Sequence, residues 1–179
     1  MGQDFDKDTE APFGTIPWMK DHLNGLELND SMAIIQYLIY QYPGPLTPEN
    51  NEVAARVGMY WGWVQDYYSF VLSPFHDIIT GHNEVFWRNL RLTDSLANGG
   101  KKAGVENLAT LHKKRVEYLE RHLVKVNAGP FLTGSKCSYA DVFLYTCVRT
   151  VQESKGFGLL RDACEGKPFA EFNLVTNIS

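Results

Sequence analysis

Three prolines within six residues divide this chain of 179 residues into two unequal parts. They lie in the run Pro43-Gly44-Pro45-Leu46-Thr47-Pro48. Proline lacks a main-chain N–H and restricts the residue before it, so neither a helix nor a central strand continues through such a run. We therefore expect a linker at residues 44–48, between a small N-terminal domain at 1–43 and a larger domain at 49–179.

The N-terminal part has the pattern of a β-hairpin followed by a helix. Residues 16–20 and 26–28 read as strands, and Asn24-Gly25 between them is a strong hairpin-turn signal. Apolar residues then recur at helical spacing, which predicts a helix from about Ser31 to Gln41. Asp30 and Ser31 are suitable capping residues for the start of that helix.

No strand pattern follows the linker, so the larger domain is predicted to be all helical. Helices are expected near 50–70, 83–96 and 105–126, with Pro74 kinking or ending the first and Asn98-Gly99-Gly100 stopping the second. The third helix carries a mostly apolar stripe at helical spacing: Leu108, His112, Val116, Leu119, Leu123 and Val126. We interpret His112 on this stripe as a core histidine.

A capping box begins a further helix. Ser138 and Asp141 have the required spacing, with Asp in place of the usual Glu or Gln. The Ser138 hydroxyl can accept from the Asp141 N–H, and the Asp141 carboxylate from the Ser138 N–H. Cys137 and Val142 can form the accompanying hydrophobic staple. The helix is apolar over much of its girth, so we expect it to be central.

Composition excludes several classes of protein. The formal net charge of -4 argues against a nucleic-acid partner, because phosphate binding needs a concentrated basic face. Three cysteines without a Cys-x-x-Cys spacing argue against a disulfide framework and against a zinc site, and no other metal site is expected. No stretch is long and apolar enough to span a bilayer, and the acidic N-terminus is not a signal peptide. A cytoplasmic location is the simplest interpretation.

Three motifs, in this order, resemble those of the cytosolic glutathione transferase family. Phe13-Gly14-Thr15-Ile16-Pro17 looks like the family's Phe-Gly-x-x-Pro strand, and Asp30-Ser31-Met32-Ala33-Ile34 looks like its Gln/Glu-Ser-x-Ala-Ile motif. Gly134-x-x-x-Ser138-x-Ala140-Asp141 is similar to its capping signature. The resemblance covers nearly the whole chain from Phe13. The implied fold is α+β and mostly α: an incomplete thioredoxin-like β-β-α piece followed by an all-helical glutathione transferase C-terminal domain.

The resemblance implies a glutathione site. A cis peptide at Pro17 would expose the main chain of Ile16, which would pair with the cysteinyl part of glutathione as an added strand. Ser31 at a helix N-terminus would bind the γ-glutamyl carboxylate, and Asp30 would balance the γ-glutamyl ammonium. Asp66 looks like the acid that reaches the same ammonium across the dimer interface in some members.

Each of these assignments has a plainer alternative. Pro17 can be an ordinary trans proline in an edge strand, and Ser31 can be only an N-cap. Aromatic residues, chiefly Tyr60, Trp63, Tyr67 and Tyr68, are proposed to line the apolar pocket of the second substrate. The alternative is that they belong to the core or to a subunit interface.

The implied function is the conjugation of glutathione, as a co-substrate, to small electrophilic apolar molecules in detoxification, by a homodimer without a metal. In the family, a strand, a helix and a second strand precede the proline strand. The catalytic Tyr, Ser or Cys lies near the end of the first of these strands. The 12 residues before Phe13 cannot hold these elements, so the catalytic residue is expected in an N-terminal segment missing from this chain. The alternative function is a non-catalytic ligand-binding, structural or interaction protein of the same family.

Overall fold

The fold is α+β and mostly α, with a short antiparallel sheet followed by helical segments. The computed structural model describes residue 11 and residues 13–80, 93–126, 129–153, 155–158 and 160, without the side chains of 78–80, 93–103 and 155. The chain divides into two compact units, Met1–Thr47 and Pro48–Ser179. The boundary between them falls within the proline run.

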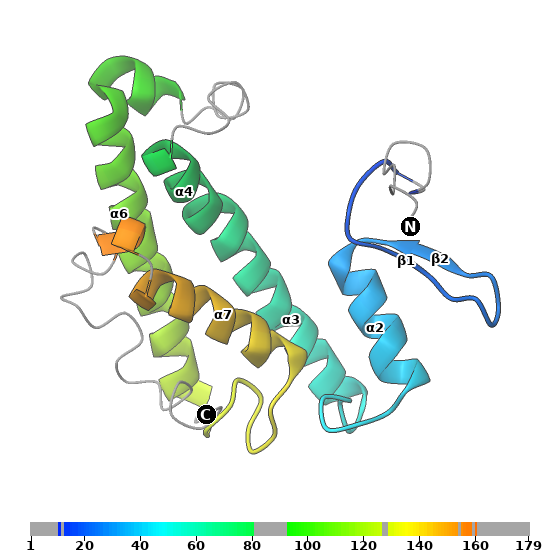
Figure 1. The fold of residues 1–179 in the computed structure, drawn as a ribbon. Coiled ribbons are helices and arrows are strands. Elements are labelled where there is room, and N and C mark those ends of the chain that lie inside the picture. Colours follow the sequence, from blue (N-terminus) through cyan, green and yellow to red (C-terminus); the bar gives the residue numbers. More distant parts are fainter. Residues whose placement is uncertain are drawn as a thin grey trace. The chain divides into compact units, whose positions relative to one another are not determined.

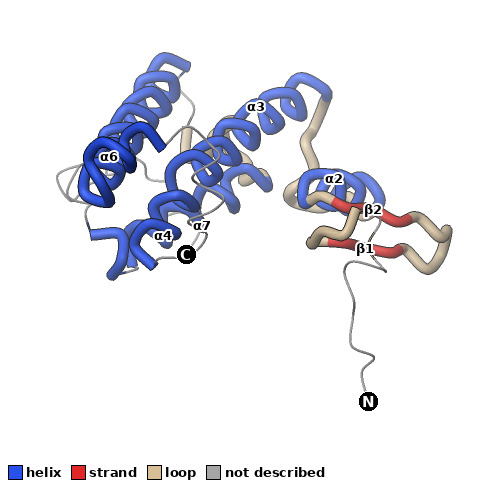
Figure 2. Tube along the Cα trace, turned by 90° about the horizontal axis from the view of Figure 1, so that it is seen from above, coloured by secondary structure: helices blue, strands red, loops and turns tan. Residues whose placement is uncertain are grey.

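The N-terminal unit is a β-hairpin with one helix packed along it (Figure 2). Strand β1 (Trp18–Lys20) pairs antiparallel with β2 (Glu27–Asn29), and Trp18 lies opposite Asn29. Helix α2 (Ser31–Gln41) begins one residue after β2 and contacts both strands. The predicted hairpin and helix are confirmed, with β1 starting two residues later than expected.

Side-chain hydrogen bonds tie the hairpin turn to α2. Asp21 Oδ1 accepts from the Leu23 N–H at 2.8 Å, and Gly25 has a φ of +73°, in the left-handed region that favours glycine. The Tyr37 hydroxyl on α2 donates to Asp21 Oδ2. This hydrogen bond lowers the pKa of Asp21 and raises the pKa of Tyr37. The local turn chemistry and the helix position therefore support each other.

The C-terminal unit begins with a long helical rod (Figure 1). Helix α3 (Asn51–Tyr67) continues through the π-helical turn η1 (Tyr68–Leu72) into α4 (Ser73–Thr80). The Ser73 N–H bonds to the Tyr68 carbonyl, five residues back. The helix therefore does not end at Pro74, because the wider π turn accommodates a residue that lacks an N–H and crowds the preceding turn.

Helix α6 (Thr93–Val126) corrects the expected pair of shorter helices. It runs through Asn98-Gly99-Gly100, so the stop predicted there is wrong. Each glycine costs a helix only about 1 kcal/mol relative to alanine. The buried stripe that follows outweighs this cost: Leu108, His112, Val116, Leu119 and Leu123 are all buried, whereas Val126 is exposed. Most of the predicted 83–96 helix lies outside the described residues.

Helix α7 (Tyr139–Glu153) supplies much of the core of this unit, as expected, and the short 3-10 helix η2 (Lys155–Phe157) follows it. It packs along α3, where Trp61 meets the Tyr139 ring at 5.5 Å and the Phe143 ring at 4.8 Å. Its buried residues are Tyr139, Ala140, Asp141, Leu144, Cys147, Val148 and Val151. None of the described helices has both the length and the apolar character needed to cross a membrane.

Candidate functional site

An open main-chain segment lies just before β1. Ile16 is 68% exposed, and within the described part of the chain no hydrogen bond uses its main-chain N–H or C=O. The Ile16–Pro17 peptide is cis, which confirms the prediction for Pro17. Continuing the register from Trp18 and Asn29 places Ile16 opposite Ser31. The open main chain and the start of α2 therefore lie at the same end of the hairpin.

Asp30, rather than Ser31, caps helix α2. Asp30 Oδ1 accepts from the N–H groups of Met32 at 2.9 Å and Ala33 at 3.1 Å, and Ser31 is the first helical residue. Two of the N–H groups that make a helix N-terminus attractive to anions are therefore already occupied. The N–H and hydroxyl of Ser31 and the Asp30 Oδ2 atom have no hydrogen bond among the described residues. These three groups are what the start of α2 adds to the open main chain of Ile16.

The backbone at Asp30 is strained. Asp30 has a φ of +79° and a ψ of +131°. It is the only non-glycine residue with a positive φ in the described ranges. Such conformations cost about 1–3 kcal/mol and cluster at ligand-binding sites. The strain lies between the hairpin and α2, where Asp30 is both a cap and the nearest acid to Ser31.

Two of the tyrosines expected to line a substrate pocket, Tyr60 and Tyr67, pack in the core between α3 and α6. Tyr67 has no exposed surface, and its hydroxyl lies 2.8 Å from His112 Nδ1, while Trp63 stacks on the Tyr67 ring at 5.5 Å. Tyr60 is 4% exposed and meets His122 edge to face. Within the described part of the chain, Tyr60 and Tyr67 are therefore buried, and α6 places a histidine against each ring.

The His112 imidazole is fully buried, as the stripe predicted. Burial lowers its pKa from 6.5 to about 4, so it is neutral at pH 7. Its Nε2 atom has no hydrogen-bond partner among the described residues. The pair with Tyr67 is therefore a buried polar contact of a neutral imidazole, and burial disfavours the charged form of that imidazole.

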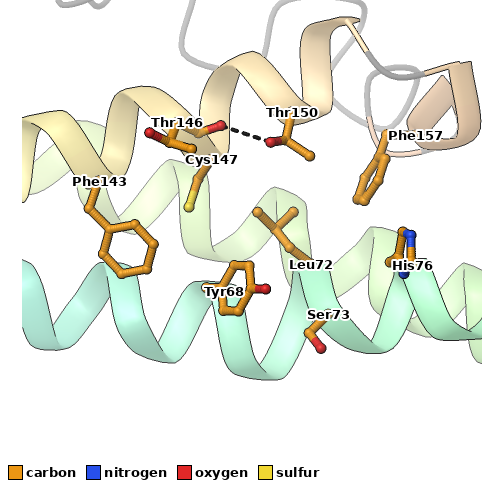
Figure 3. A pocket seen from close by; sticks show the side chains of 9 residues that line it. All are labelled: Tyr68, Leu72, Ser73, His76, Phe143, Thr146, Cys147, Thr150 and Phe157. Atoms are coloured by element: carbon orange, nitrogen blue, oxygen red, sulfur yellow. Dashed lines mark hydrogen bonds between the residues drawn. The ribbon is translucent and has the colours of Figure 1, made fainter. Parts of the chain in front are cut away.

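A cavity of about 270 Å³ lies within the C-terminal unit, between η1 and α4 on one side and α7 and η2 on the other. Figure 3 shows Phe143 and Cys147 extending from α7 toward Tyr68 and Leu72, and Phe157 of η2 extending toward His76. Ser73, His76, Thr146 and Thr150 complete its lining. Of the predicted pocket residues, Tyr68 lines it, and Tyr60, Trp63 and Tyr67 do not.

The chemistry of the cavity wall is mostly apolar. The hydroxyls of Thr146 and Thr150 donate to carbonyls of their own helix at 3.0 and 2.9 Å. Burial raises the pKa of the Cys147 thiol to about 12, so this group is a protonated, apolar wall atom. The sequence pattern missed Leu72 and Ser73 because the π turn at 68–72 sets which side chains of this rod face α7.

The predicted capping box at Ser138 and Asp141 is present and fully enclosed. Asp141 Oδ2 accepts from the Ser138 N–H at 2.8 Å, and the Asp141 N–H donates to the Ser138 hydroxyl at 3.4 Å. The other carboxylate oxygen accepts from the Leu132 N–H at 2.8 Å, a contact that the motif did not predict. Asp141 thus joins the loop before α7 to the helix itself.

The remaining predicted groups are less constrained. Asp66 is an exposed residue on α3. Its Oδ2 atom lies 4.0 Å from Nη1 of Arg115, which is on α6. Burial and, to a lesser extent, the Asp141 carboxylate raise the pKa of the Cys137 thiol, which favours packing over reactivity there. The described residues contain no group of three His, Cys, Asp or Glu side chains that could hold a metal ion.

Comparison with known proteins gives one match to a family model, within the helical part of the chain, and one match to a curated protein. Residues 97–169 match the family model described as glutathione S-transferase, C-terminal domain. The chain is also 33% identical over 136 residues to the glutathione S-transferase-like protein OpS6 of Beauveria bassiana (strain ARSEF 2860). The chain belongs to the glutathione S-transferase family.

The match to this relative has limits in length. It covers 73% of this chain and 54% of the relative, so the chain spans about half the length of the curated relative that it matches. No solved structure matched the chain. In the described part of this chain, the open end of the hairpin and the cavity beside α7 are two features with room for a ligand.

Proposed function

We propose that this chain binds glutathione at the end of its hairpin and that the protein conjugates glutathione to electrophilic apolar molecules. The observation that carries the proposal is the open Ile16 main chain at the same end of the hairpin as Ser31. A peptide ligand that adds as a strand needs one free N–H and one free C=O in register, and Ile16 offers both. The cysteinyl residue of glutathione is the part that would pair there.

The γ-glutamyl end of glutathione has both charges that the start of α2 can satisfy. In the proposed complex its carboxylate accepts from the N–H and hydroxyl of Ser31, at the positive end of the helix dipole. Its ammonium pairs with Asp30 Oδ2, while Oδ1 keeps capping the helix. Asp30, which stands where the family has Gln or Glu, thus both caps the helix and pairs with the ammonium.

Replacing Ser31 with alanine tests the anion contact. We expect glutathione affinity to fall by at least about tenfold, because a hydrogen bond to a charged group is lost. The melting temperature should stay the same, since Asp30 and not Ser31 caps the helix. Isothermal titration calorimetry and thermal unfolding measure the two quantities. Unchanged affinity together with unchanged stability would leave Ser31 without a role in binding.

Substitutions of Asp30 can separate its role as a helix cap from the role of its negative charge in binding. In Asp30→Asn the amide oxygen still caps α2 and the residue still tolerates a positive φ, so the free energy of unfolding should change by less than about 0.5 kcal/mol. Glutathione affinity should nevertheless fall by about tenfold, because the ammonium loses its charged partner. Asp30→Ala should lose both properties. If the asparagine variant binds glutathione as well as wild type does, Asp30 is only a cap.

We further propose the cavity beside α7 as the place for the electrophile. Its volume is close to the lower limit for small-molecule pockets, and aromatic rings of Tyr68, Phe143 and Phe157 suit a compact aromatic substrate. In the proposed reaction the glutathione thiolate attacks the ring carbon of a chlorodinitrobenzene, forms the C–S bond and releases chloride. None of the described residues is assigned as the group that activates the thiol.

Filling the cavity tests this second assignment. Cys147→Met adds volume at the cavity wall, and we expect the KM for 1-chloro-2,4-dinitrobenzene to rise about threefold or more while glutathione affinity is unchanged. Cys137→Met is the matched control, because Cys137 does not line the cavity. Equal kinetics in both variants would place the electrophile elsewhere.

The proposal as a whole is tested by two assays on the purified chain. Retention on immobilised glutathione tests binding, and turnover of 1-chloro-2,4-dinitrobenzene tests conjugation. Binding of an aromatic ligand without any turnover would favour the second candidate, a non-catalytic ligand-binding protein, which the apolar cavity also supports. A homodimer in which Asp66 reaches the ligand of the other subunit, a cytoplasmic location and a role in detoxification remain predictions from the family.

A further inference from the structure

We propose that Asn29 is a positioning residue for glutathione, which holds the main chain on both sides of Ile16 so that Ile16 itself stays open. This inference rests on the proposed glutathione-binding function. Asn29 is the last residue of β2, immediately before Asp30, and is 8% exposed. None of the sequence motifs assigned it a role.

The Asn29 side chain makes contacts on each side of Ile16. Its Nδ2 atom donates to the Thr15 carbonyl at 2.6 Å and more weakly to the Pro17 carbonyl at 3.3 Å. Its Oδ1 atom accepts from the Phe13 N–H at 3.3 Å. The carbonyls before and after Ile16 are therefore both turned toward β2, and the carbonyl of Ile16 is the one between them that is left without a hydrogen bond.

These contacts replace strand pairing where the ladder stops. The β1–β2 register ends with Trp18 opposite Asn29, so no ladder hydrogen bond holds residues 13–16. A segment outside the ladder would lose conformational freedom when glutathione binds, and that entropy would weaken binding. The buried amide removes part of this freedom in advance, which is the physical basis of preorganisation.

An amide is the side chain that satisfies this arrangement. It presents two N–H donors toward two carbonyls and one oxygen toward an N–H. A carboxylate of the same shape would still accept from the Phe13 N–H, but its second oxygen would repel the carbonyl oxygens of Thr15 and Pro17. A serine would be too short to reach both sides. The pattern therefore predicts different consequences for Asn29→Asp and Asn29→Ser.

The experiment measures binding and local order in the full chain. In both Asn29→Asp and Asn29→Ser we expect glutathione affinity by calorimetry to fall by about tenfold. In ¹H–¹⁵N NMR titrations, glutathione should shift the Ile16 and Ser31 amides of wild type. In the variants the Ser31 amide should still shift at high glutathione concentration, while the Ile16 shift should be much reduced. A general structural defect would affect both amides alike.

Two controls keep the outcome specific. Glu27→Ser changes an exposed residue of the same strand whose side chain pairs with Lys20 among the described residues, and the variant should bind glutathione like wild type. Thr15→Val removes a hydroxyl at 3.4 Å from Nδ2 and keeps the carbonyl, so it too should bind normally. If Asn29→Ser folds and retains wild-type affinity with a wild-type Ile16 shift, the inference fails. If wild type itself does not bind glutathione, the proposed function fails with it.

Discussion

Replacing Asp141 with alanine is expected to lower the free energy of unfolding by about 4 kcal/mol, enough to lower the melting temperature by roughly 10 °C. The carboxylate is fully buried and accepts from the Ser138 N–H, the Ser138 hydroxyl and the Leu132 N–H. Its removal leaves two buried main-chain N–H groups without an acceptor, which costs more than the loss of an exposed cap. Thermal and urea unfolding, followed by circular dichroism, measure the change.

Ser138→Ala is the matched comparison for this prediction. It removes only the hydroxyl, while the N–H groups of Ser138 and Leu132 keep their bonds to Asp141, so the expected loss is about 1 kcal/mol. Asp66→Ala removes an exposed acid with one long ion pair and should change stability little. Equal losses for Asp141→Ala and Ser138→Ala would show that the bonds from the Ser138 and Leu132 N–H groups to Asp141 contribute nothing.

Acidification is expected to destabilise the C-terminal unit through His112. Its pKa is about 4 in the folded chain and 6.5 when free, so between these values the unfolded chain binds a proton that the folded chain does not. The stabilisation is complete above pH 6.5 and is lost as the pH falls toward 4. At about 1.4 kcal/mol for each pKa unit, the loss is about 3 kcal/mol.

Urea unfolding at pH 7, 5.5 and 4.5 measures this dependence. In His112→Gln the group that titrates is absent, so the fall in stability between pH 7 and 4.5 should be smaller than in wild type by about 2 kcal/mol, because part of the loss lies below pH 4.5. The variant can be less stable at pH 7, because its contact with Tyr67 changes, and only the slope is compared. Parallel curves for the two proteins would mean that His112 does not control acid stability.

Local motifs predicted the elements that carry the site. The hairpin followed from Asn24-Gly25 between two short apolar runs, and α2 begins and ends where the helical spacing placed it. The capping box at Ser138 and Asp141 was likewise readable, because both partners lie within one helical turn. In each case the deciding interactions join residues that are close in sequence.

Longer-range interactions were not readable in the same way. Asn29 reaches residues 12 to 16 positions earlier in the chain, and the Leu132 N–H reaches Asp141 across a loop. The glycine pair at 99–100 suggested a helix stop, yet α6 continues through it, since its buried stripe outweighs a local propensity. Nothing in the local pattern records such compensation.

The sequence alone determined the family resemblance, the hairpin, the start of α2 and the capping box of α7, and the resemblance implied the cis proline that the structure contains. These depend on short-range chemistry, in which a turn, a cap or a restricted dihedral is satisfied by near neighbours. Only the tertiary structure decided that Tyr60 and Tyr67 face histidines of α6 while Tyr68 lines a cavity, and that Asn29 fixes the main chain around Ile16. An aromatic or amide side chain acquires such a role from the surface packed against it, and that surface comes from a distant part of the chain.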